Sequence, residues 1–235
     1  MGKIQSIGAA ALIAVCWQAQ ASVVTFTGGT ATMLDASTHV STNSTTWSPV
    51  DFYVEAGFKL DFLPGAAWGY VGDYYGVGNS VIHAHWALGG LGSVATIEIT
   101  KVGGGTFDLN YFKLTSNTDT GGGAANGTEL AYVEGFNSNV STGAAVLLPS
   151  ENWGFPASQI FLGSAFDLVD KVVFYTTTDV DCFGMDEFFI DEAAPGVPGG
   201  GGAVPEAASL VVWSLMGGVG IGIVWYRRRN LELVV

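Results

Sequence analysis

Phe107-Asp108-Leu109-Asn110-Tyr111 is the stretch that decides the fold of this chain. Its apolar and polar residues alternate, so Phe107, Leu109 and Tyr111 fall on one face of an extended strand. Three consecutive glycines precede it at 103–105, and a glycine-rich segment follows at 117–123. The pattern therefore predicts a half-buried strand with a turn at each end.

Segments of the same kind follow one another from residue 22 to residue 192, and none of them shows sustained helical periodicity. We expect strands at 23–27, 52–62, 80–88, 94–101, 107–115, 129–136, 144–148, 169–177 and 182–191. Nine or ten strands in about 170 residues predict one all-β domain, an antiparallel β-sandwich of the jelly-roll type.

Charge is distributed unevenly along the chain. Residues 22–206 contain 20 acidic and 4 basic side chains, a net charge of −16, whereas the other basic residues lie near the two ends. Such an acidic domain repels a phosphate backbone, so nucleic acid is excluded as a partner.

The N-terminal segment has the order of a secretory signal peptide. Lys3 is followed by an apolar run at 7–17 and by Ala19-Gln20-Ala21, which matches an A-x-A cleavage site. The run is too short to span a bilayer, which favours cleavage. We therefore expect a signal peptide at 1–21 and an exported domain at 22–192.

The C-terminal segment has three parts. Residues 193–203 form a linker rich in glycine and proline, and residues 207–226 contain no charge and are long enough for one membrane-spanning helix. Arg227, Arg228 and Arg229 follow, and the positive-inside rule places them in the cytoplasm with residues 230–235. The sequence thus predicts a membrane anchor with the acidic domain outside.

The residues before this span are Val204-Pro205-Glu206, with Ala207 next. Together with the span and the arginines, they resemble the tail of bacterial PEP-CTERM proteins, in which a second proline usually stands at the position of Ala207. The resemblance implies recognition by a membrane-embedded exosortase at residues 204–229. It also implies cleavage near the motif and delivery to the cell surface or to an extracellular matrix, where exopolysaccharide is an expected partner.

Two stretches of the exported domain also resemble jelly-roll domains of PEP-CTERM proteins and carbohydrate-binding modules. They are Gly105–Leu109 and Phe183–Ile190.

The ends of the chain also fit a eukaryotic type I or GPI-anchored protein, with glycosylation sequons at Asn43, Asn126 and Asn139.

Aromatic residues stand out in three places in the domain. Trp68, Tyr70, Tyr74 and Tyr75 lie in a glycine-rich stretch that is expected to be a loop, and Trp86 and 153–155 form further clusters. Flat rings with polar neighbours can bind sugar rings, so the first region is a candidate carbohydrate site. The alternative is that these rings only pack within the sandwich.

Two sets of residues are candidate metal ligands. Asp179, Asp181, Asp186 and Glu187 offer carboxylate oxygens of the kind that Ca²⁺ prefers, or are solvated turn residues. His83 and His85 project from one face of an expected strand and can bind a transition metal if a third ligand joins them. The alternative is that they are hydrogen-bonded or exposed strand histidines without a metal. Asp73 is a conceivable third ligand, and Cys182 is expected to be a small buried side chain.

The sequence contains neither a G-x-S-x-G nor an H-E-x-x-H motif. We therefore expect a non-enzymatic surface protein, structural or adhesive and associated with exopolysaccharide. A carbohydrate-binding module is the first alternative. A glycoside hydrolase or lyase is the second, because such an enzyme needs only two suitably spaced acids.

Overall fold

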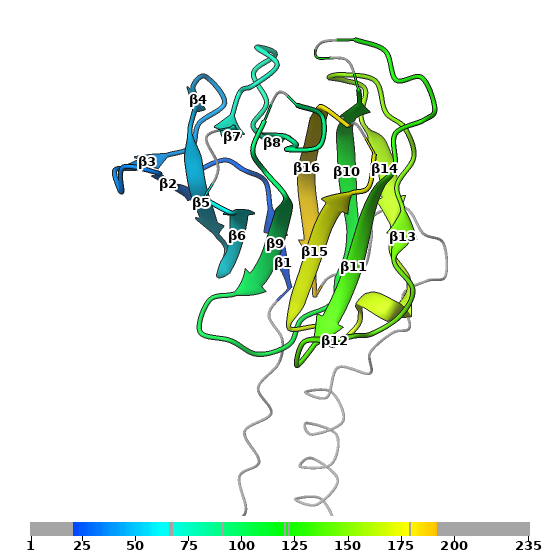
Figure 1. Cartoon of the computed structure of the whole chain (residues 1–235). Helices are drawn as coiled ribbons and strands as arrows, with labels where there is room; N and C mark the ends of the chain where they lie inside the picture. Colours follow the sequence, from blue (N-terminus) through cyan, green and yellow to red (C-terminus); the bar gives the residue numbers. More distant parts are fainter. Residues whose placement is uncertain are drawn as a thin grey trace, which may run out of the picture. The chain divides into compact units, whose positions relative to one another are not determined.

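The computed structural model describes residues 21–65, 68–90, 92–119, 121, 123–178 and 180–191. These residues form two antiparallel sheets that face each other across one core (Figure 1). The one helix among them is a short 3-10 turn at Ser164–Phe166. The predicted all-β antiparallel sandwich is therefore confirmed. The strand pairings do not by themselves establish the connections of a jelly roll, so that part stays a prediction.

The smaller sheet has seven strands. Its order is β14 (Ser158–Phe161), β10 (Leu109–Thr118), β16 (Cys182–Ile190), β8 (Val81–His85), β7 (Gly69–Gly72) and β4 (Thr46–Trp47), with β1 (Ser22–Val24) paired to β16.

The larger sheet has nine strands. Its order is β12 (Val140–Ser141), β11 (Ala131–Asn137), β15 (Lys171–Thr176), β9 (Thr96–Lys101), β6 (Phe58–Leu63), β5 (Val50–Glu55), β2 (Thr30–Met33) and β3 (Thr38–Val40), with β13 (Val146–Leu147) paired to β11.

Aromatic side chains from both sheets interlock in the core. The Phe174 ring of β15 lies 5.4 Å from that of Phe112 on β10 and 6.1 Å from that of Phe188 on β16, and all three are fully buried. Because alternate residues of each strand point inward, the remaining residues of β8, β10 and β16 form the outer face of the seven-stranded sheet.

Two local expectations were wrong. The segment 52–62 is two strands rather than one, because Ala56 and Gly57 adopt positive φ angles of 51° and 84° and close the hairpin between β5 and β6. The stretch around Trp68 and Tyr70 is not simply a loop, because Gly69–Gly72 forms β7 and pairs with both β4 and β8.

Several predictions lie outside the described residues. They concern Ala19 and the rest of the signal segment before Ala21, Asp179, the linker, Val204, Pro205 and Glu206, the span at 207–226, and Arg227, Arg228 and Arg229. Within the residues that are described, no helix has the length and apolar character needed to cross a membrane.

Candidate functional site

The outer face of the seven-stranded sheet carries two histidines on its central strand β8. Ile82 and Ala84 point into the core, so His83 and His85 point to the opposite face. Their ring centroids lie 5.2 Å apart. The burial of Ile82 and Ala84 thus supports the prediction that the two histidine rings share the opposite face.

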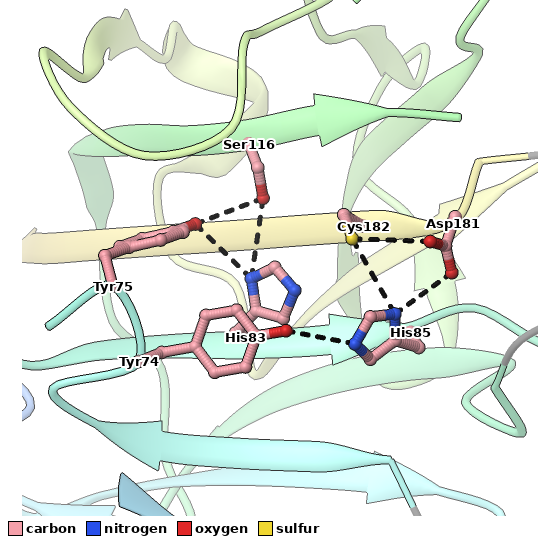
Figure 2. Close-up of polar contacts among 7 residues, drawn as sticks. All are labelled: Tyr74, Tyr75, His83, His85, Ser116, Asp181 and Cys182. Carbon is pink, nitrogen blue, oxygen red and sulfur yellow. Dashed lines mark hydrogen bonds and ion pairs between the residues drawn. The ribbon is translucent and has the colours of Figure 1, made fainter. Parts of the chain in front are cut away.

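Strand β16 places a cysteine beside this pair. Cys182 is the direct partner of His85 and Gly184 is the direct partner of His83 in the antiparallel register. The Cys182 Sγ lies 3.7 Å from the Nδ1 of His85, so the thiol, the two imidazoles and their strands meet at one point (Figure 2).

Asp181 supplies a buried carboxylate at the edge of the same cluster. Its Oδ1 lies 3.0 Å from His85 Nδ1, and its Oδ2 accepts a hydrogen bond of 3.5 Å from the Cys182 thiol. The Asp181 side chain is 2% exposed and that of His85 is 12% exposed, so the cluster reaches solvent only on the His85 side.

The loop that follows β7 covers the histidines. The Tyr74 ring stacks on His83 at 3.9 Å and 15°, and the Tyr74 hydroxyl lies 3.1 Å from His85 Nε2. The Tyr75 hydroxyl lies 3.3 Å from His83 Nδ1 and also contacts Thr115 (Figure 2 shows both tyrosines over the strand). The histidines are therefore beneath the tyrosines rather than beside them.

Burial sets the protonation states of these groups. Complete burial, reinforced by the neighbouring His85, holds the pKa of His83 well below its ordinary value, so this imidazole is neutral. Burial likewise raises the pKa of Tyr74, and it raises that of Tyr75 to about 12, although the hydrogen bonds that Tyr75 shares with Ser116 and Thr115 oppose the rise. Both phenols remain protonated donors at neutral pH.

The conceivable third ligand, Asp73, is not part of the cluster. Its Oδ1 accepts hydrogen bonds from the backbone N–H groups of Val77 and Gly78, at 2.9 and 3.1 Å, and so closes the loop. Among the described residues, one ligand atom each from His83, His85 and Cys182 lies within 4.8 Å of the other two. The prediction of Asp73 was wrong because pairing between β8 and β16, which lie about a hundred residues apart, supplies Cys182 instead.

The carboxylates predicted to bind Ca²⁺ have separate partners. Asp181 contacts His85, Asp186 accepts a hydrogen bond from Asn79 at 3.0 Å, and Glu187 forms an ion pair with Lys113 at 2.6 Å. In the part of the chain that the structure describes, these acids do not group as a metal cluster. Calcium binding, which also involved Asp179, stays a prediction.

The predicted aromatic residues form a continuous row that begins at an exposed tryptophan. Trp68 is 44% exposed, its ring lies 6.5 Å from that of Tyr70, and Tyr70 lies 4.9 Å from Tyr74. Tyr74 and Tyr75 both contact Trp153, at 6.1 and 4.7 Å. The Tyr75 ring lies 5.6 Å from that of Phe155, which is 39% exposed.

Sequence reasoning identified these aromatic groups but did not place 153–155 next to Tyr74 and Tyr75, because only the fold brings the two segments together. Trp86, the remaining aromatic residue that the sequence pointed to, does not join them, because it is fully buried in the core. We call Trp68, Tyr70, Tyr74, Tyr75, Trp153 and Phe155 the aromatic row.

Comparison with known proteins gives few matches. No family model matches the chain, and no curated protein matches it. Among solved structures, a family 29 carbohydrate-binding module from Piromyces equi matches at 12% identity with a TM-score of 0.35, over 77% of this chain and 97% of the module. A mutant of a second family 29 module matches at 11% identity with a TM-score of 0.32, over 77% and 99% of the two chains. Both TM-scores are low, so neither match assigns a ligand to this chain.

Proposed function

We propose that this chain is an exported, non-catalytic β-sandwich protein that binds polysaccharide through the aromatic row. The observation that carries the proposal is the continuity of the row, in which six rings follow one another across a sheet face with an exposed ring at each end. Flat rings of this kind stack on the apolar faces of sugar rings.

Polar groups next to the row suit a sugar ligand. Lys113 and Glu187 form an ion pair that remains partly exposed on the same outer face. Asp73 and Asn79 lie on the loop that carries Tyr74 and Tyr75 and are half-buried. Such groups can hydrogen-bond to sugar hydroxyls while the rings supply the apolar contact.

The place of action that we propose rests on the two ends of the chain. A signal peptide and a PEP-CTERM-like tail would deliver the sandwich through an exosortase to the cell surface or the surrounding matrix. Exopolysaccharide is the polymer expected there. The acidic domain also favours neutral polymers, because it repels anionic ones.

Binding to insoluble and immobilised polysaccharides tests this function. Trp68→Ala is expected to weaken binding about 5- to 30-fold, since one stacked ring contributes on the order of 1–2 kcal/mol. Tyr132→Ala is the matched control, because Tyr132 stacks on Tyr175 in the nine-stranded sheet, away from the row. It should bind like the parent chain.

Two results would contradict the proposal. Equal binding by the parent chain and Trp68→Ala would show that the aromatic row does not bind the polysaccharide. Release of reducing sugar, abolished by one carboxylate substitution, would instead identify a glycoside hydrolase or lyase.

A further inference from the structure

A buried ring nitrogen in the histidine cluster has no hydrogen-bond partner. His83 is completely buried and its Nδ1 faces the hydroxyls of Tyr75 and Ser116, but its Nε2 contacts no donor or acceptor among the described residues. A buried nitrogen without a hydrogen-bond partner destabilises the fold unless another group binds it. Figure 2 shows this nitrogen on the side of the ring that faces His85 and Cys182.

The groups near that nitrogen are close enough to bind one metal ion together with it. Cys182 Sγ and His85 Nδ1 are 3.7 Å apart. Two atoms bound to one tetrahedral ion at about 2.0–2.3 Å lie roughly 3.6 Å from each other, so this separation suits a shared ion. The Asp181 carboxylate contacts both groups and can balance the charge of a cation.

The outer contacts of both histidines also suit metal binding. A ligating imidazole usually gives its other N–H to an oxygen, which fixes the orientation of the ring. His83 Nδ1 faces the hydroxyl oxygens of Tyr75 and Ser116, and His85 Nε2 faces that of Tyr74. Each ring is thus held by one nitrogen while the other remains directed into the cluster.

The donor set selects the class of ion. One thiol and two imidazoles suit zinc or another late transition metal, whereas Ca²⁺ and Mg²⁺ require oxygen ligands. His83 is neutral in this environment, as a ligating imidazole must be. The partial exposure of His85 leaves a path by which an ion can enter.

We propose that His83 Nε2, His85 Nδ1 and Cys182 Sγ bind one Zn²⁺-class transition metal ion, with Asp181 as the adjacent carboxylate. The ion would connect β8 to β16 beneath Tyr74. None of these four residues belongs to the aromatic row, so Zn²⁺ titration and the binding of Trp68→Ala to polysaccharide test the two proposals separately.

Metal titration of the whole chain tests the site. The protein is purified without a polyhistidine tag, stripped with a chelator and titrated with Zn²⁺ in a calorimeter, and a second sample receives Co²⁺ for absorption spectroscopy. We expect one bound Zn²⁺, a higher Tm that excess Ca²⁺ does not reproduce, and a thiolate-to-cobalt charge-transfer band. Cys182→Ser should abolish the band, and His85→Gln should weaken Zn²⁺ binding at least about 100-fold.

The chain offers a matched control in its third histidine. His39 stacks on Trp47 outside the cluster, so His39→Gln should bind Zn²⁺ like the parent chain. Circular dichroism of the stripped variants establishes that they are folded. His85 is partly exposed, so its variant provides the test even if Cys182→Ser does not fold. Absence of saturable Zn²⁺ binding by the parent chain, or equal binding by parent and His85→Gln, would overturn the proposal.

Discussion

Glu129 shows how a single buried charge can be stabilised by backbone donors. Its side chain lies before β11, and its two carboxylate oxygens accept hydrogen bonds from the N–H groups of Asn126 and Gly127, each at 2.9 Å. Burial opposes the charge, but the hydrogen bonds from Ser150 and from these backbone groups outweigh it. They lower the pKa of Glu129 from its ordinary 4.5 to about 2.

Because the folded-state pKa lies below the unfolded one, the charge stabilises the fold above about pH 4.5, and this stabilisation is lost as the pH falls towards 2. We predict that Glu129→Gln lowers the free energy of unfolding by about 2–3 kcal/mol at pH 7 and by much less near pH 2.5. Urea titrations at both values measure this. Glu134→Gln on the outer side of β11 is the control and should change stability by less than about 0.5 kcal/mol. An equal loss of unfolding free energy at both pH values would show that the charge of Glu129 is not what stabilises the fold.

At the scale of the element, β16 requires a glycine at the point where the loop that carries Tyr74 and Tyr75 packs against it. A Cβ on Gly184 would meet the hydroxyls of Tyr75 and Thr115. We therefore predict that Gly184→Ala displaces Tyr75 from His83 and lowers the free energy of unfolding by about 1–3 kcal/mol. Gly163→Ala is the control, since a Cβ there meets nothing within 4 Å and its φ of −98° suits any residue. Thermal melts and tyrosine fluorescence follow both changes, and identical results would contradict the tight fit at Gly184.

The same strand shows how much could be predicted from sequence. Alternation correctly indicated a strand around Leu109, although a register shift leaves Tyr111 outside the core cluster that holds Leu109. The i, i+2 spacing correctly gave His83 and His85 a common face. These are local properties of the chain. The placement of Cys182 opposite His85 depends instead on the register between β8 and β16, which no local pattern specifies. For the same reason, no local pattern shows that Cys182 rather than Asp73 lies beside His85, or that Trp153 contacts Tyr75.

For the described domain as a whole, the two outer faces of the sandwich differ in character. The seven-stranded sheet carries the aromatic row and the histidine cluster. The nine-stranded sheet carries the stacked pair Tyr132 and Tyr175 and ion pairs such as Lys171 with Glu98. Partly exposed ion pairs do not distinguish the two faces, since Lys113 and Glu187 form one on the seven-stranded sheet, and such pairs contribute little to stability. The chemistry that we propose is therefore confined to one face.

We propose that the C-terminal tail brings that face to a polymer outside the cell, and this is testable on the whole chain in a bacterium that has an exosortase. The net charge of −16 over residues 22–206 and the three arginines after the span predict an external domain and a cytoplasmic end. We expect the whole chain in the membrane fraction or, after processing, at the surface, whereas a chain that stops after Ala203 should be soluble. Ala207→Pro completes the sorting motif and should raise the processed fraction, with Gly200→Ala in the linker as an unchanged control. If the truncated and whole chains fractionate alike, the proposed anchor is wrong, whatever the sandwich binds.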